Sequence, residues 1–452
     1  MFKSLNMQQS PINSKLLLIA VIALLSFIPL GILMDITSDR QALQQQVIDD
    51  IGNSWGHAQR VAGPVLVVPY TYEIVNNSVD NNGDIKQVRS HFNSELVILP
   101  KQLDLDIAVQ HDLLSRGIFE SLVYKGNISG KAQFDLSNLT VANLIRFDYR
   151  NARIVFAVSA NQAIDKVSRF DLIAVNSAAQ QPTLGELMPG TGLSEQPGLQ
   201  SGFHRLVDLS DKHTQLETDF AIQLRGSQAI SALPLGQQTQ LTFTADWPHP
   251  SFKGLLPTSR HIDNQGFKAT WQVSHLTRNY PQQFSTQSRQ NLTEVEAYAQ
   301  LFQPVTHYGQ IHRAVKYGLL FILLSCITLL IFELSLKRNV SLIQYLMITC
   351  AMTLFYLLLL SLSEHLPFSL AYGLATLVPI TSVSLYMGSI MASKRHGAIM
   401  AALLSCLYAL LYGVLKLEDY ALLMGSALLV VVMLVLMFIT RHVPETEQKA
   451  LL

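Results

Sequence analysis

The run Leu16–Met34, LLLIAVIALLSFIPLGILM, contains no charged residue. A helix of about 20 apolar residues is long enough to cross a bilayer, so this run predicts a membrane-spanning helix. A cleaved signal peptide is the alternative interpretation, but its apolar part is usually about 7–15 residues long and ends at a small-x-small site. Here Gly31 is followed by Ile, Leu and Met before Asp35, without such a site. We therefore expect an uncleaved membrane anchor.

Five further apolar runs occupy the last third of the chain. Each has about 20 or more residues with at most one charge near an end, which is typical of spanning helices. The predicted spans are Tyr317–Leu336, Leu342–Leu362, Phe368–Met391, Gly397–Leu417 and Ala421–Thr440. Buried helices of a soluble protein are the alternative, but five such runs in a row with almost no polar face argue against it. Gly397 and Ala401 form a small-x-x-x-small pair suited to helix packing.

Composition and charge agree with a membrane protein. Of 452 residues, 49% are hydrophobic and 14% are charged, below the roughly 25% of an ordinary soluble domain. The 32 basic and 32 acidic residues balance, so nothing in the composition indicates nucleic-acid binding. Three cysteines in so long a chain exclude a disulfide-dense secreted scaffold.

Basic residues in the short loops predict the orientation of the spans, because cytoplasmic loops carry an excess of Lys and Arg. The basic positions on one side are Lys3, Lys15, Lys337, Arg338, Lys394, Arg395, Arg441 and Lys449. The opposite turns, Ser363–Pro367 and Glu418–Tyr420, contain none. We expect both termini in the cytoplasm. The predicted domains are 1–34 (N-terminus and first span), 35–316 (periplasmic), 317–440 (five spans) and 441–452 (cytoplasmic tail).

The region 35–316 is predicted to be β-rich with a helix at its start. Apolar residues recur every four positions over Leu43–Trp55, which indicates a helix continuing from the first span and ending at Gly63-Pro64. Beyond it, the apolar residues of Leu103–Val109 alternate with less apolar ones, as in a half-buried strand. Several such runs separated by turn residues predict antiparallel sheet, as one sandwich or two. The fold class is thus a membrane protein, α+β, with six transmembrane helices and an inserted periplasmic domain.

Searches for catalytic and metal-binding motifs give no enzyme signature. The phosphate-binding G-x-x-x-x-G-K-[ST] and H-E-x-x-H are absent. The letters of G-x-S-x-G occur at Gly52–Gly56, but in a stretch whose periodicity predicts a helix and not the sharp strand-to-helix turn that a catalytic serine needs. We therefore predict no enzyme activity, no cofactor and no metal. The most unusual soluble segment is Trp247–Phe252, in which two prolines hold His249 in a rigid extended turn. One interpretation is a presented histidine, and the other is a strand end whose Trp247 and Phe252 fill the core.

Acidic residues stand out in and beside the predicted spans. Glu333 lies four residues before Lys337, which indicates either an i,i+4 pair at the membrane edge or an intramembrane acid in a relay. Glu364-His365 and Glu418-Asp419 lie at the predicted outer ends of spans. They are candidates for docking the soluble domain or for positions in the headgroup region.

The sequence resembles the CreD family, inner-membrane proteins of bacteria that are described as cell envelope integrity proteins. The resemblance extends along nearly the whole chain. Its most specific parts are Trp247–Phe252 with Arg260 and Trp271, Ser363-Glu364-His365, Phe332-Glu333 and Leu417–Leu423. It implies an inner-membrane location and a role in envelope integrity, and it assigns no catalytic residue.

Three functional hypotheses follow. The first is a non-enzymatic protein of envelope integrity and stress response, whose periplasmic domain binds an unidentified envelope component. Its expected partners are membrane lipid and another envelope protein or cell-wall component. The second is a transporter or lipid-handling permease in which Glu333 and Glu364-His365 line a path, and the third is a membrane enzyme using His249. The sequence indicates no oligomeric state.

Overall fold

The computed structural model describes residues 11–79, 85–175, 181–209, 214–301, 307–336 and 340–416, and the single positions 423, 426, 427, 430, 433, 434 and 437. The chain divides into two compact units, one formed by Gln44–Pro304 and the other by Met1–Leu43 together with Val305–Leu452. Most of the predicted sixth span, the predicted cytoplasmic tail, and both Glu418 and Asp419 lie outside the described residues.

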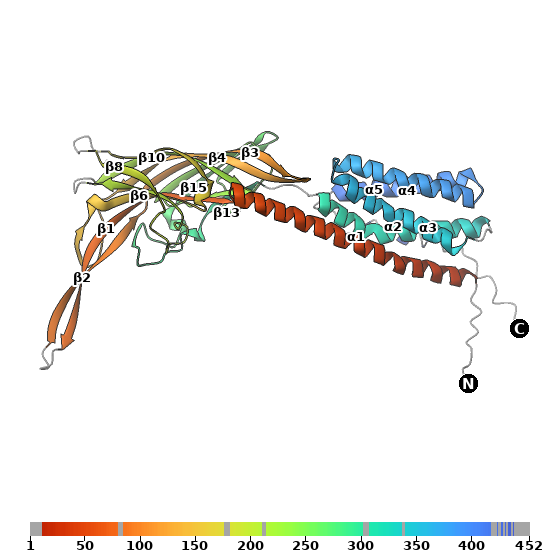
Figure 1. Cartoon of the computed structure of the whole chain (residues 1–452), viewed down its shortest axis with the longest axis horizontal. Helices are drawn as coiled ribbons and strands as arrows, with labels where there is room; N and C mark the ends of the chain where they lie inside the picture. The colour runs from red at the N-terminus through yellow and green to blue at the C-terminus, as the bar shows by residue number, and fades with distance from the viewer. Residues whose placement is uncertain are drawn as a thin grey trace. The chain divides into compact units, whose positions relative to one another are not determined.

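Long apolar helices make this chain a membrane protein. They are α1 (Pro11–Trp55), α2 (His307–Leu336), α3 (Leu342–Ser363), α4 (Phe368–Ile390) and α5 (Lys394–Lys416) (Figure 1). Over the described ranges, these five helices have the length and composition needed to cross a bilayer. Helix α2 begins ten residues before the predicted start at Tyr317. The prediction missed these first turns because they are polar and give no hydropathy signal.

Aromatic side chains fill the centre of the helix bundle. Helix α4 packs on α3 and α5, and α2 packs on the same two helices. The ring of Phe355 lies 4.6 Å from that of Tyr408 and 5.6 Å from that of Tyr372. At the α4–α5 crossing, a Cβ on Gly397 would lie 2.8 Å from the Ser384 carbonyl oxygen. The predicted packing role of Gly397 is therefore confirmed, because only a residue without a side chain permits this approach.

Helix α1 continues well past its apolar part and ends at Trp55, where Gly56 adopts a φ of +135°. The sequence-based prediction that Gly63-Pro64 ends this helix is wrong. Those two residues lie inside strand β1 (Gln59–Val79), where the pairing register shifts between Ala62 and Val65. Gly and Pro are tolerated in a strand at such a bulge, since the ladder is already interrupted there.

Strands within the described residues form two sheets (Figure 1). The ten-stranded sheet consists of β1, β2 (Ile85–Ile98), β5 (Leu144–Phe147), β6 (Ala152–Val158), β8 (Thr183–Pro189), β9 (Gly202–Asp208), β11 (Ala229–Ala232), β13 (Pro250–Gly254), β16 (Gln283–Ser285) and β17 (Ala297–Leu301). The seven-stranded sheet consists of β3 (Gln102–Arg116), β4 (Phe119–Asp135), β7 (Ile164–Ala174), β10 (Gln215–Ser227), β12 (Gln238–Ala245), β14 (Ser259–Asp263) and β15 (Gly266–Ser274).

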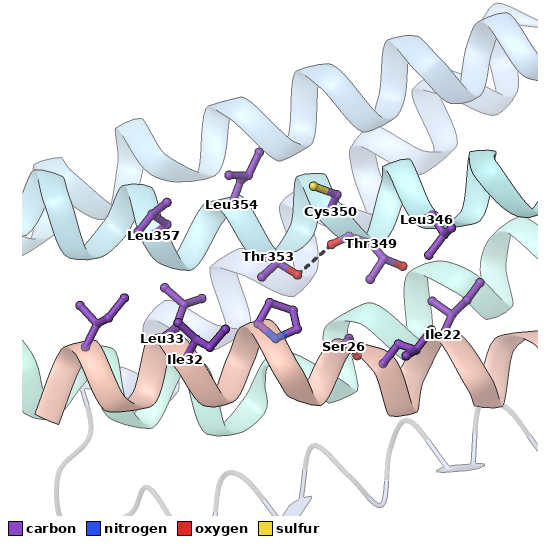
Figure 2. Close-up of a pocket in the computed structure, with 13 residues that line it drawn as sticks. Ile22, Ser26, Ile32, Leu33, Leu346, Thr349, Cys350, Thr353, Leu354 and Leu357 are labelled. Carbon is purple, nitrogen blue, oxygen red and sulfur yellow. Dashed lines mark hydrogen bonds between the residues drawn. The ribbon is translucent and has the colours of Figure 1, made fainter.

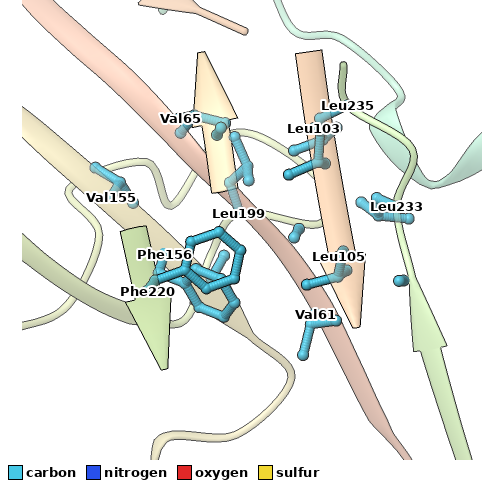
Figure 3. Close-up of a cluster of buried hydrophobic side chains, with 14 of the residues drawn as sticks. Val61, Val65, Leu103, Leu105, Val155, Phe156, Leu199, Phe220, Leu233 and Leu235 are labelled. Carbon is cyan, nitrogen blue, oxygen red and sulfur yellow. The ribbon is translucent and has the colours of Figure 1, made fainter. Parts of the chain in front are cut away.

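One hydrophobic core joins the two sheets (Figure 3). Phe156 of β6 and Phe220 of β10 meet in it with ring centroids 5.4 Å apart. The alternation predicted for Leu103–Val109 is confirmed, because each of its four large apolar residues is at most 4% exposed. The predicted antiparallel pairing holds for most strand pairs of the described residues, but β1 pairs with β11 and β3 with β12 in parallel. Strands so distant in sequence need no tight turn to join them, so local turn signals do not reveal their direction.

Candidate functional site

Trp271 and Phe252 belong to the core of the β-rich domain. Trp271, on β15, is 1% exposed, and its Nε1 donates to the Leu255 carbonyl oxygen at 2.8 Å. Its ring lies 4.7 Å from that of Phe243 and 5.7 Å from that of half-buried Phe252. These contacts favour the core-filling interpretation of Phe252. Arg260 is exposed on β14, an edge strand that pairs with β15.

Trp247 and His249 form a surface cluster with His111 and Asp246. The Trp247 ring lies 5.2 Å from the His111 ring and 6.2 Å from the ring of the exposed His249. Asp246 Oδ1 lies 2.7 Å from His111 Nδ1 and also accepts the His111 backbone N–H at 2.9 Å. The carboxylate therefore orients this imidazole, as second-sphere carboxylates do in histidine sites. In the part of the chain that the structure describes, no group of three His, Cys, Asp or Glu residues could hold a metal ion.

Sequence reasoning missed His111, although the sheet explains its position. Strand β3 runs parallel to β12, and Val109 is the partner of Ala245. Continuing this register by two residues on each strand places His111 beside Trp247, which agrees with the contact between their rings. No local motif could reveal this contact, because the two residues are 136 positions apart.

Glu333 is the centre of a buried polar cluster that connects three helices. The side chain lies on α2 and is 4% exposed. Its Oε2 accepts the Tyr345 hydroxyl of α3 at 3.0 Å, its Oε1 accepts the Val340 backbone N–H at 2.9 Å, and it pairs with Lys15 of α1. The predicted partner Lys337 lies outside the described residues. The carboxylate is thus neutralised and hydrogen-bonded, as a charge in an apolar helix bundle needs to be.

Glu364, at the C-terminal end of α3, makes a second connection to α1. Its Oε1 lies 3.4 Å from Arg40 Nε and accepts the Tyr308 hydroxyl of α2 at 3.4 Å. The Glu364 side chain is 12% exposed, whereas its neighbour His365 is exposed. Of these two adjacent residues, Glu364 therefore contacts other helices, whereas His365 faces the surface.

The two carboxylates hold α1 at widely separated points. Lys15 and Arg40 are 25 residues apart on one continuous helix, a separation of about 37 Å at 1.5 Å per residue. A bilayer is about 30 Å thick in its hydrocarbon core and 40–45 Å with its headgroups, so we expect the two pairs near opposite interfaces. Sequence reasoning used Lys15 only for topology and did not pair it, and it overlooked Arg40, Tyr308 and Tyr345 as partners.

An apolar groove of about 440 Å³ lies between α1 and α3 (Figure 2). Ile22, Ser26, Ile32 and Leu33 of α1 face Leu346, Thr349 and Leu357 of α3 across it. Its few hydroxyls have partners: Ser26 Oγ donates to the Ala23 carbonyl oxygen at 2.6 Å and Thr353 Oγ1 to the Thr349 carbonyl oxygen at 2.9 Å, within their own helices, and Thr349 Oγ1 lies 3.7 Å from Cys326 Sγ of α2. Such a surface offers dispersion contacts and no free polar group, which suits a lipid acyl chain.

These features define a multi-span membrane protein with a β-rich domain inserted after its first helix. The family model described as inner membrane protein CreD matches residues 11–444, so the chain belongs to the CreD family. It is similar to inner membrane protein CreD of Escherichia coli (strain K12), with 29% identity over 440 residues that cover 97% of this chain and 94% of that protein. The resemblance noted in the sequence is thereby confirmed.

Proposed function

We propose that this protein supports cell envelope integrity and the envelope stress response as a non-enzymatic component of the inner membrane. In this proposal the β-rich domain lies in the periplasm and binds an envelope component, and the helices anchor it. Both termini are cytoplasmic, as the distribution of Lys and Arg indicates. Membership of the CreD family supports the membrane part of the proposal.

The observation that carries the proposal is the attachment of α1 to the β-rich domain. Trp55, the last residue of α1, donates from Nε1 to the Tyr124 carbonyl oxygen of β4 at 3.3 Å. The Arg225 guanidinium of β10 lies 5.2 Å from the centre of the Trp55 ring, in a cation–π contact. The last part of α1, which belongs to the same compact unit as the strands, thereby contacts two neighbouring strands of the seven-stranded sheet.

Tyr124 extends this attachment to the other sheet. Its side chain is fully buried, and its hydroxyl donates to the Ala229 carbonyl oxygen of β11 at 2.8 Å. Burial raises the pKa of the Tyr124 phenol, so it remains a protonated donor throughout the physiological pH range. The end of α1 is thus linked to both sheets through Tyr124, as we expect if α1 anchors the whole β-rich domain.

Replacing Trp55 by alanine tests the attachment. We expect the variant to insert into the membrane but to restore the detergent and β-lactam resistance of a gene-deletion strain only partly. Trp55→Phe keeps a smaller aromatic face for Arg225 and loses the N–H donor, so its rescue should be intermediate. Trp247→Ala is the comparison, because it removes another half-buried tryptophan, whose ring lies against those of His111 and His249. Full rescue by Trp55→Ala at normal abundance would contradict the proposal.

A transporter or lipid-handling permease is the second candidate, and the buried Glu333 carboxylate favours it. Ionisable residues inside membrane bundles often belong to transport paths. The contacts of Glu333 and Glu364 point instead to helix attachment, because each acid pairs with a cation of α1. A transport path through these acids requires that the Glu333→Gln and Glu364→Gln double variant lose function while remaining folded. Our proposal predicts retained function.

A further inference from the structure

A cavity of about 470 Å³ lies in the β-rich domain, apart from the cluster around Trp247. Strands β1 and β2 and two chain segments, residues 140–143 and 281–290, provide its walls. Small-molecule sites in proteins commonly have volumes of about 300–1,000 Å³ and combine aromatic surface with a few placed polar groups. This cavity has both features, and neither the family nor the proposed function explains them.

Two tyrosines of β1 line the cavity, of which Tyr72 is half-buried and offers its ring, whereas Tyr70 is 6% exposed and belongs to the hydrophobic core. Tyr70 and Tyr72 are two positions apart, so their side chains leave the same face of the strand. Their ring centroids are 5.7 Å apart, and Phe92 supports Tyr72 from the neighbouring strand at 5.8 Å. The electron-rich faces of such rings attract the weakly positive C–H groups of a sugar ring.

Neutral hydrogen-bonding groups surround the two tyrosines and hold one another in place. The Gln287 amide Nε2 donates to the Tyr72 hydroxyl at 3.0 Å, and the Tyr70 hydroxyl donates to Ser285 Oγ at 3.0 Å. The Gln290 amide Nε2 donates to Ser288 Oγ at 2.7 Å. Amides and hydroxyls both donate and accept, which matches the adjacent hydroxyls of a sugar. Mutual hydrogen bonds fix the side-chain rotamers and so lower the entropy lost on binding.

The lining of the cavity disfavours other classes of ligand. It contains no Lys, Arg, His, Asp or Glu, whereas phosphate and carboxylate groups are bound by cationic side chains. Amide and hydroxyl groups line it alongside the apolar residues, which disfavours a lipid tail. A peptide added as an extra strand beside the cavity would need a free edge at Leu96–Ile98, where β16 already pairs with β2.

We propose that this cavity binds a short, uncharged stretch of glycan. This inference rests on the proposed function, because it names the chemical class of the envelope component that the β-rich domain binds. A sugar ring stacks on Tyr72, which Tyr70 and Phe92 support, and the glutamine amides hydrogen-bond the sugar hydroxyls.

Calorimetric titration of the full-length protein tests the proposal. The protein is kept in a detergent without a sugar headgroup, since a glycoside detergent would compete for the cavity. The probes are tetra-N-acetylchitotetraose, cellotetraose and maltotetraose, with N-acetylated, C-amidated tetra-alanine as the uncharged peptide comparison. We expect saturable binding of at least one glycan. Tyr72→Ala should weaken it tenfold or more, and Gln287→Ala and Tyr72→Phe should weaken it about two- to tenfold, the loss of one neutral hydrogen bond.

Gln272→Ala is the matched control, because it removes an exposed glutamine from the other sheet. The affinity of this variant for the glycan should equal that of the unmodified protein. Absence of glycan binding overturns the proposal, as does binding that is insensitive to Gln287→Ala and Tyr72→Phe. Tetra-alanine binding with the same sensitivity overturns the ligand class. Rescue of the deletion strain is measured separately, so failure of glycan binding is distinguishable from failure of the envelope role.

Discussion

Glu333→Ala is expected to destabilise the helix bundle by about 3–5 kcal/mol, the usual cost of removing one partner from a buried ion pair. The substitution leaves the Lys15 ammonium, the Tyr345 hydroxyl and the Val340 N–H without their acceptor. Lys15 is 23% exposed and so recovers part of its hydration, which places the expected loss at the lower end of that range. The thermal midpoint of the purified protein, followed by helix circular dichroism, measures the effect.

A double-mutant cycle separates the ion pair from the hydrogen bonds. Lys15→Met alone should cost less than Glu333→Ala, because Glu333 keeps two of its donors. The double variant should lose less stability than the sum of the two single losses, because removing both charges leaves neither Lys15 nor Glu333 as an unpaired charge. Additive losses would contradict the contact between Lys15 and Glu333.

Trp271→Ala is expected to destabilise the β-rich domain by about 3–5 kcal/mol, because it empties a large, fully buried site. It also leaves the Leu255 carbonyl oxygen without its donor and Phe243 and Phe252 without their shared neighbour. For a domain of this size, about 2–4 °C is lost per kcal/mol, so the midpoint of sheet unfolding should fall by roughly 6–20 °C.

Trp247→Ala provides the comparison within the same motif. Its half-buried ring contacts His111 and His249 at the surface, so we expect a loss of less than about 2 kcal/mol. Equal losses of stability in Trp271→Ala and Trp247→Ala would contradict the prediction that Trp271 contributes more to the core than Trp247 does. Trp271→Phe should lie between them, because it keeps one aromatic ring in the core but loses the second ring of the indole and its hydrogen bond.

The features predictable from sequence are those encoded by short-range periodicity. Uninterrupted apolar runs revealed the spans because nothing but a bilayer requires about 20 such residues in succession. Leu103 and its alternating neighbours revealed β3 for a similar reason, since a strand with one buried face repeats every two residues. Gly63-Pro64 was misread because the same pair serves as a helix terminator and as a bulge inside a strand.

The candidate sites depend on contacts between distant segments, and periodicity carries no such information. Glu333 stood out as an acid in an apolar run, but its partner Lys15 lies 318 positions earlier. The cavity joins Tyr72 to Gln287, and neither residue belongs to a recognisable motif. Trp247–Phe252 was conspicuous, and its rings divide between a surface cluster and the core.

Rescue of a gene-deletion strain by a chain without the β-rich domain tests the proposed role of that domain most directly. Residues 59–301 are replaced by a Gly/Ser linker, and membrane abundance is matched to that of the full chain. Survival in detergent and β-lactam is the measurement. The proposal predicts that the full chain and the Glu333→Gln and Glu364→Gln double variant restore resistance, whereas the shortened chain does not. Resistance restored by the helices alone would contradict it.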